Sequence, residues 1–308
     1  MPVHSILNEM LVQGLPPTPK DARKWCSLLE SGAILYFPKT PIPIPSEDEA
    51  FLLGQQQTGS SLHKNIAYKP GRDKLSGIDA KSTSHQEATR LHQIMRRYSV
   101  AIADYLSRFL APYNQRWQLD YASYRPFEEE GRDLPMHRRN DLLHTDAFPT
   151  RPTRGWRILR FFHNIHPTRT RDWMVTEPFS NLLDQFAPER ISLPAPDNTF
   201  NRAGRKIAQA AGLSKLLPQL KRTPYDEFMI QLHNTMKEDA GFQRSCPKEH
   251  FSFAPGSSWM VYTETVPHAV LAGQFALEQT FLVDPQAATN PDTAPLAILE
   301  KRVGARLA

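Results

Sequence analysis

A histidine and an aspartate two positions apart form the clearest candidate for chemistry in this chain. His144 and Asp146 stand in the segment LLHTDAF, before a Pro/Thr/Arg-rich loop and a dense strand-like run at 156–165. Residues i and i+2 of a strand point to the same face, so this imidazole and this carboxylate would converge. They would supply two of the three ligands of a 2-His-1-carboxylate iron site. An H-x-D motif alone is common, so the hypothesis depends on a third ligand.

His268 is the candidate for that third ligand. It stands between two strand-like runs, at 259–265 and 269–283. In a double-stranded β-helix, an early strand pair carries H-x-D and a late strand carries the distal histidine, so the two meet in space. We therefore expect His144, Asp146 and His268 to occupy one face of a metal ion, leaving three positions for a co-substrate and oxygen.

The other histidines fit no second site. His163 shares a face with Leu159 and Phe161, which indicates a core role, whereas His166 at the strand end could touch a substrate. No spacing indicates zinc, no G-x-S-x-G elbow or nucleotide-binding glycine motif occurs, and the acids at 128–130 are typical of a solvated loop. Three histidines in polar surroundings are expected to be exposed: His137, His233 and His250.

A 2-oxoglutarate site also needs a cation for the distal carboxylate of the co-substrate, and guanidinium is the natural choice. The stretch 268–283 contains neither Arg nor Lys, so we look to the strand after H-x-D. Arg157 and Arg160 lie there at an odd offset, so only one of them can face inward. Arg160 is favoured because it shares parity with the polar residues Asn164 and His166, and Arg157 is the alternative. Asn164 is a further candidate for binding the co-substrate.

The surrounding pattern predicts the elements that would position these residues. Apolar side chains recur at helical spacing over 85–110 and again over 225–239. Strand-like runs cluster in the second half of the chain, and a further alternating run covers 117–124. The expected fold class is α+β, mostly antiparallel β, with a double-stranded β-helix (jelly-roll) core flanked by helices.

We expect residues 1–308 to form a single dioxygenase domain. Within it, 1–84 would be a loop-rich extension packed on the core, and 85–285 would hold the long helix and the β-helix core, with a helical insert at about 184–240. The extension would contain short helices around 7–11 and 21–29 and an edge strand within 33–45. Its basic cluster is either a solvated loop or part of a cleft for an anionic substrate: Lys64, Lys69, Arg72 and Lys74.

The composition indicates what class of partner the protein binds and in which compartment it is expected. The net charge of +5 suits a phosphate-bearing or anionic partner but is too diffuse for a nucleic-acid binder. The two cysteines have neither disulfide-scaffold nor metal-pair spacing, which favours a reducing compartment. Without a signal-peptide pattern or a long apolar stretch, we expect a cytoplasmic protein.

Three segments together resemble the Kdo hydroxylase family: LLHTD, WRILRFFHNIHP and VPHAVLAGQFALEQTF. These are Fe(II)- and 2-oxoglutarate-dependent dioxygenases that hydroxylate C3 of 3-deoxy-D-manno-oct-2-ulosonic acid (Kdo) on lipid A. The resemblance is clear over about 110–285. It implies iron bound by His144, Asp146 and His268, 2-oxoglutarate bound by Arg160, and O2 as the oxidant. It also implies that Arg125, in YASYRP, is a second basic residue of the cleft.

The resemblance further implies an anionic glycolipid partner, Kdo–lipid A, with peripheral contact at the inner leaflet of the inner membrane. Two alternatives remain open at this point. One is a 2-oxoglutarate dioxygenase with another substrate, and the other is a cupin-like module that binds sugar without catalysis.

Overall fold

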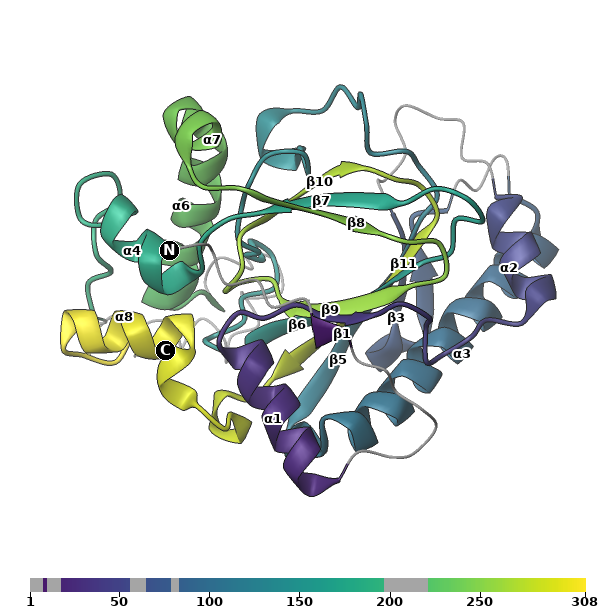
Figure 1. The fold of residues 1–308 in the computed structure, drawn as a ribbon, viewed down its shortest axis with the longest axis horizontal. Helices are drawn as coiled ribbons and strands as arrows, with labels where there is room; N and C mark the ends of the chain where they lie inside the picture. The colour runs from purple at the N-terminus through teal and green to yellow at the C-terminus, as the bar shows by residue number, and fades with distance from the viewer. Residues whose placement is uncertain (1–7, 10–17, 56–64, 79–82, 197–220) are drawn as a thin grey trace.

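Two β-sheets face each other, and helices cover the outer face of the larger sheet and lie beside the pair (Figure 1). The structure is a computed structural model that describes residues 8–9, 18–55, 65–78, 83–196 and 221–308. Lys64 and the helical piece expected around 203–217 lie outside the described residues. Of the helix expected around 7–11, only Asn8 and Glu9 are described, and they form a short strand instead.

The larger sheet contains eight strands within the described residues, and all its pairings are antiparallel except that of β1 with β2. Long strands occupy its centre and short ones its edges. In spatial order the strands are β1 (Asn8–Glu9), β2 (Leu35–Phe37), β9 (Ser258–Tyr262), β6 (Arg157–Asn164), β11 (Ala276–Val283), β5 (Trp117–Arg125), β3 (Ile66–Lys69) and β4 (Lys74–Ser76).

The smaller sheet has three antiparallel strands in the described part of the chain, in the order β10 (His268–Ala272), β7 (Arg171–Val175) and β8 (Glu249–Phe253). Aromatic side chains fill the space between the two sheets. Trp259 stacks on Phe162 and Phe253, and Trp173 meets all three edge-on. This double-sheet, jelly-roll arrangement confirms the expected fold class.

The outer face of the larger sheet is covered by α1 (Pro19–Glu30) and α3 (His85–Phe109). Helix α3 begins at a capping box, in which Ser84 and Glu87 satisfy each other's backbone N–H groups. Its apolar stripe, with Leu91, Met95 and Ile102 fully buried, packs on the sheet as the sequence predicts. The helix ends at Phe109, and Pro112 follows in a short 3-10 turn.

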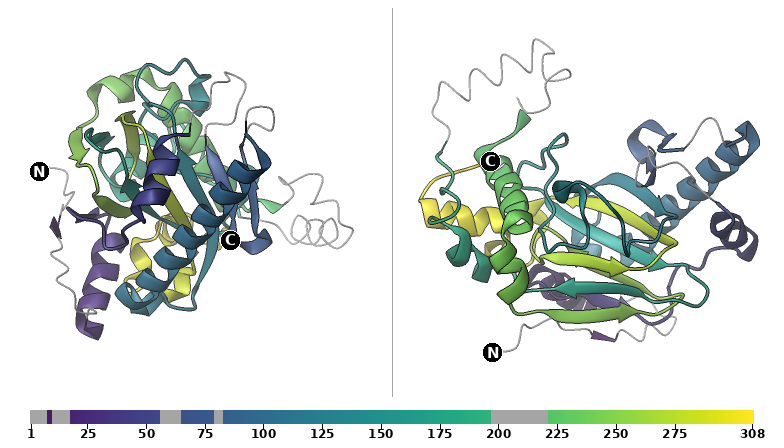
Figure 2. Two further views of the ribbon diagram at one scale, coloured as in Figure 1. Left: turned by 90° about the vertical axis from the view of Figure 1, so that its right-hand side faces the viewer. Right: turned by 90° about the horizontal axis from the view of Figure 1, so that it is seen from above.

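A second group of helices lies on the opposite side of the sheets from α2 (Ser46–Leu53) and α3 (Figures 1 and 2). It has its own apolar core, which includes Leu143 and Ala269, the chain neighbours of two expected metal ligands. Its members are α4 (Phe179–Phe186), α6 (Pro224–Glu238), α7 (Ala240–Ser245) and α8 (Pro295–Val303). This group therefore fixes the backbone on which the candidate site is built.

The run at 269–283 is not one strand, as the sequence pattern suggested, but two strands in different sheets. The break is at Gly273, which has φ +116 and lies against Arg171 of β7. A Cβ at this position would stand 2.9 Å from the Cα of Arg171. The break cannot be predicted from the apolar pattern, because the residues on both sides of Gly273 are mostly buried.

The N-terminal segment supplies strands as well as loops. β2 pairs with β9, with only the two-residue β1 beyond it, and β3 and β4 extend the other end of the larger sheet. Helix α2 and the β3–β4 hairpin were not expected, because prolines and polar residues obscure their periodicity. Among the described helices, none combines the length and apolarity that a membrane crossing requires.

Replacing Gly273 by Ala should destabilise the fold by about 2–4 kcal/mol, because the backbone conformation disfavours a side chain and the added carbon meets the Arg171 backbone. Gly256→Ala is the matched control. Gly256 also has positive φ, at +72, but no atom lies within 4 Å of a Cβ there, so the loss should be about 1 kcal/mol. Chemical denaturation measures both, and equal losses would contradict the close-contact explanation.

Candidate active site

His144 and His268 are joined to each other through their backbones. The N–H of His144 donates to the carbonyl of His268 at 3.1 Å, and the N–H of His268 donates to the carbonyl of His144 at 3.0 Å. This antiparallel bridge aligns the two residues side by side, with their ring centroids 4.9 Å apart. Two imidazoles far apart in the sequence are thereby fixed next to each other.

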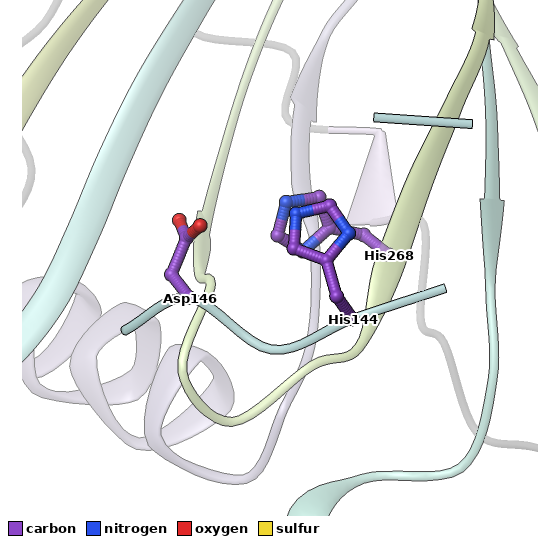
Figure 3. Close-up of side chains that lie close together, drawn as sticks. All are labelled: His144, Asp146 and His268. Carbon is purple, nitrogen blue, oxygen red and sulfur yellow. The ribbon is translucent and has the colours of Figure 1, made fainter. Parts of the chain in front are cut away.

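Asp146 completes the group, although H-x-D is not in a regular strand. The segment is extended, and only His144 makes a ladder contact. The backbone N–H of Asp146 donates to Thr263 at 2.9 Å, which ties it to the connection after β9. One ligand atom from each of His144, Asp146 and His268 lies within 4.8 Å of the others (Figure 3). The structure thus brings together the three residues that the sequence predicts as ligands.

The rings of both histidines are held in one tautomer. Nδ1 of His144 lies 2.7 Å from the carbonyl oxygen of Leu142, and Nδ1 of His268 lies 3.1 Å from that of Val266. Because a carbonyl oxygen only accepts, each Nδ1 carries the proton and each Nε2 is left with its lone pair. Trp173 stacks on the His268 ring, with centroids 5.0 Å apart, and holds its orientation.

Burial keeps this donor set ready for a cation. It lowers the pKa of His144 well below its usual value and also lowers that of His268, so both rings are neutral at neutral pH. Burial alone would raise the pKa of Asp146, but Arg160 and the two histidines outweigh it, so the carboxyl is ionised. Two neutral imidazoles and one carboxylate on one face match the ligand preference of Fe(II) in oxygenases.

Arg160 lies directly beside this donor set. Its Nε is 2.8 Å from Oδ2 of Asp146, and its other end is paired with Glu278. The charges continue to alternate, because Glu278 pairs with Arg125 at 2.6 Å and Arg125 lies 3.6 Å from Glu129. Arg171 follows, 3.4 Å from Glu129. The structure therefore places the predicted Arg160 and Arg125 in one buried row of alternating charges that begins at Asp146.

Arg157 faces the other way, as its odd offset from Arg160 requires. Its guanidinium is 1% exposed, pairs with Glu264 at 3.0 Å, donates to Thr265 and lies 3.9 Å from the ring centre of Tyr262. These contacts engage the Arg157 guanidinium in the protein interior.

Asn164 is engaged with backbone at the end of β6. Its amide nitrogen donates to the carbonyls of Arg169 and Phe253, and its oxygen accepts from the N–H of His166. The His166 ring in turn accepts from the backbone N–H groups of Thr168 and Arg169. Within the described residues, these polar side chains shape the β6–β7 connection.

Sequence reasoning was wrong about His233 and Glu129, both expected to be solvated. The His233 ring lies 5.0 Å from that of His144, and its Nδ1 is 2.7 Å from the carbonyl of Thr145, between the two early ligands. Lys237, one turn later on α6, is 4% exposed and donates to His137. Glu129 is buried among arginines. The i, i+4 spacing of His233 and Lys237 beside the apolar stripe of α6 was the available signal.

The sequence model of the 3-deoxy-D-manno-oct-2-ulosonic acid (Kdo) hydroxylase family matches residues 14–306. The chain belongs to the Kdo hydroxylase family. This confirms the resemblance carried by LLHTD and the two later segments. A search of curated proteins gave no match.

Solved structures agree with the family assignment. The Kdo hydroxylase KdoO, a non-heme Fe(II) α-ketoglutarate-dependent dioxygenase, in complex with α-ketoglutarate and Fe(III) is 31% identical, with a TM-score of 0.82 over 100% of this chain and 98% of that chain. The apo form is 34% identical, with a TM-score of 0.80 over 95% and 93%. The cobalt(II) complex is 32% identical, with a TM-score of 0.82 over 98% and 96%.

The buried His163 should make this family member sensitive to acid. Burial lowers its pKa to about 4, below the ~6.5 of an unfolded histidine. Between these values the unfolded chain binds more protons, so stability falls as pH drops through about 6.5. In His163→Leu, the loss of unfolding free energy between pH 7 and pH 5 should be smaller by about 1–2 kcal/mol. His250→Leu, at an exposed position, is the control; identical pH profiles for wild type and His163→Leu would refute this.

Proposed function

We propose that this chain is an Fe(II)- and 2-oxoglutarate-dependent dioxygenase that hydroxylates C3 of the Kdo sugar of Kdo–lipid A. The observation that carries the proposal is the His144–Asp146–His268 group, set in a fold that the chain shares over its whole length with the Kdo hydroxylase KdoO. Two of the KdoO structures hold Fe(III), one with α-ketoglutarate and one with succinate, the co-substrate and co-product expected of such a reaction.

His144, Asp146 and His268 would hold the iron. When bound, iron(II) and 2-oxoglutarate would activate O2, so that one oxygen atom converts a C–H bond to C–OH and the other enters succinate, formed from 2-oxoglutarate with loss of carbon dioxide. The protein keeps both imidazoles neutral, aims them with the Leu142 and Val266 carbonyls, and excludes water with the apolar core around them.

Arg160 would bind a carboxylate of 2-oxoglutarate. It is the guanidinium in contact with the proposed ligand Asp146, through its Nε, while its Nη1 pairs with Glu278. Arg125 would hold Glu278 in place, so that Glu278 orients Arg160 from the far side. Arg157, occupied by Glu264, would serve stability instead.

The substrate would be an anionic glycolipid. Basic residues near the site, among them Arg151 and Lys237, suit a sugar carboxylate and the lipid A phosphates. We place the protein in the cytoplasm, with peripheral contact at the inner leaflet of the inner membrane, where such a glycolipid presents its sugars.

Incubation of the protein with Kdo–lipid A, Fe(II), ascorbate, 2-oxoglutarate and air should add one oxygen atom to the glycolipid, as read by mass spectrometry, with one succinate formed per product. His144→Ala should lower the rate at least ~1000-fold because a ligand is lost. The exposed-histidine control His250→Ala should match wild type.

Two outcomes would favour the alternatives. Turnover of 2-oxoglutarate without oxygen in the glycolipid would indicate another substrate. Binding of Kdo–lipid A with no hydroxylation, undiminished in His144→Ala, would indicate a sugar-binding module without catalysis.

Removing the Arg160 charge should weaken 2-oxoglutarate binding by roughly tenfold or more, because a charge-assisted contact contributes about 1.5–3 kcal/mol. The measurement is an anaerobic titration of the Co(II)-loaded Arg160→Gln protein. The matched control is Arg157→Gln combined with Glu264→Gln, which removes both charges of the other pair and leaves neither buried alone. Equal weakening in both proteins, or loss of Co(II) binding in Arg160→Gln, would refute this role.

A further inference from the structure

A hollow of about 360 Å³ opens beside the 3-10 turn Pro70–Arg72, which joins β3 to β4. Three cationic residues line it, Lys69, Arg72 and Arg151, against one acid, Asp120. Asp120 is paired with Arg151. Among the described residues, no carboxylate pairs with Lys69 or Arg72, so the hollow has an excess of positive charge.

Two of these cations rest on the same aromatic ring. The Lys69 ammonium lies 4.9 Å from the ring centre of Tyr121, and the Arg151 guanidinium lies 4.1 Å from it. Contact with the ring favours each cation and holds both at the wall of the hollow. Burial, together with Arg160, lowers the pKa of Arg151 to about 10. An anion entering the hollow would favour the charged forms of both side chains.

The wall of the hollow is held in place rather than being a loose surface loop. Asp73, which follows the turn with φ +44, accepts a hydrogen bond from the Tyr68 hydroxyl at 2.8 Å. The same carboxylate lies 3.1 Å from His92 and 3.5 Å from Arg96 on α3. These contacts fix the turn that carries Arg72 against the long helix.

The hollow also connects to the candidate iron site through one ring. Arg151 lies 4.3 Å from the ring centre of Phe148, and Arg160 lies 5.7 Å from the same ring centre. Phe148 follows Asp146 by two residues, and Arg160 is paired with Asp146. A ligand that spans from the metal-binding side chains across Phe148 would therefore reach Lys69 and Arg72.

We propose that this hollow, formed by Lys69, Arg72, Tyr121 and Arg151, binds a phosphate group of the glycolipid substrate while its Kdo sugar lies at the metal centre. The inference rests on the proposed function and adds a second anchoring point to it. It gives Lys69 and Arg72, two members of the basic cluster that the sequence shows, a role in binding substrate, and it explains how a large glycolipid would be oriented.

The test compares Kdo–lipid A with the same glycolipid after enzymatic removal of its phosphates. Wild type should favour the phosphorylated form by about tenfold in kcat/KM, mostly through KM, which corresponds to about 1.4 kcal/mol of binding free energy. The Lys69→Gln/Arg72→Gln protein should lose this preference, so that the ratio approaches one. The control Lys20→Gln/Arg23→Gln removes the same charge from exposed positions on α1 and should keep it.

Several results would overturn the inference: no phosphate preference in wild type, a preserved preference in Lys69→Gln/Arg72→Gln, or an equal loss in both double variants. Inorganic phosphate should compete with the phosphorylated glycolipid and not with the dephosphorylated one. If Lys69→Gln/Arg72→Gln instead loses binding to phosphatidylglycerol vesicles that contain no Kdo–lipid A, the hollow recognises the membrane surface, and the substrate role is refuted.

Equilibrium binding of both glycolipids without oxygen separates this inference from the proposed function. Suppose that wild type binds the phosphorylated form more tightly without oxygen but hydroxylates neither glycolipid in the assay with air. This result would refute the proposed function and leave the phosphate site supported. Hydroxylation of both at equal kcat/KM, with equal binding, would refute the phosphate site alone.

Discussion

The backbone bridge between His144 and His268 is the interaction on which the candidate site depends. Metal ligands at the two ends of a long stretch of chain need a constraint that does not vary with side-chain conformation. Two reciprocal backbone hydrogen bonds provide one, because they fix the separation and direction of both Cβ atoms. The segment between them, with α4, α6 and α7, then packs around the bridge and buries the residues that flank it, Leu143 and Ala269.

A buried row of alternating charges extends the same site toward β5. Asp146, Glu278 and Glu129 alternate with Arg160, Arg125 and Arg171, so each ion in the row has a partner of opposite sign. Unpaired charges at such burial would be costly, and the pairing offsets much of that cost. Such a row resists deformation, because moving one side chain would leave the next charge without its partner. The arginine nearest to the metal ligands is therefore held in place before any co-substrate arrives.

Much of this site was predictable, because the candidate ligands are recognised by residue type and because side chains in a strand alternate with a period of two residues. That period separated Arg157 from Arg160, and the need for a second imidazole singled out His268. His233 and Lys237 were not found, because their i, i+4 spacing shows a shared helix face but not that packing brings this face to the site. Glu129 was missed because the long-range ion pairs that surround it leave no local pattern. The break at Gly273 was missed for a related reason, since two buried strands in different sheets have the same apolar pattern.

The stacking of Trp173 on His268 has an optical consequence. An indole in face contact with a metal-binding imidazole senses the charge and unpaired electrons of whatever that imidazole holds. Because Trp173 is 1% exposed, its emission is shielded from solvent quenching and should respond mainly to its neighbours. A metal held by His268 would thus be expected to change the emission of the indole that orients this ring.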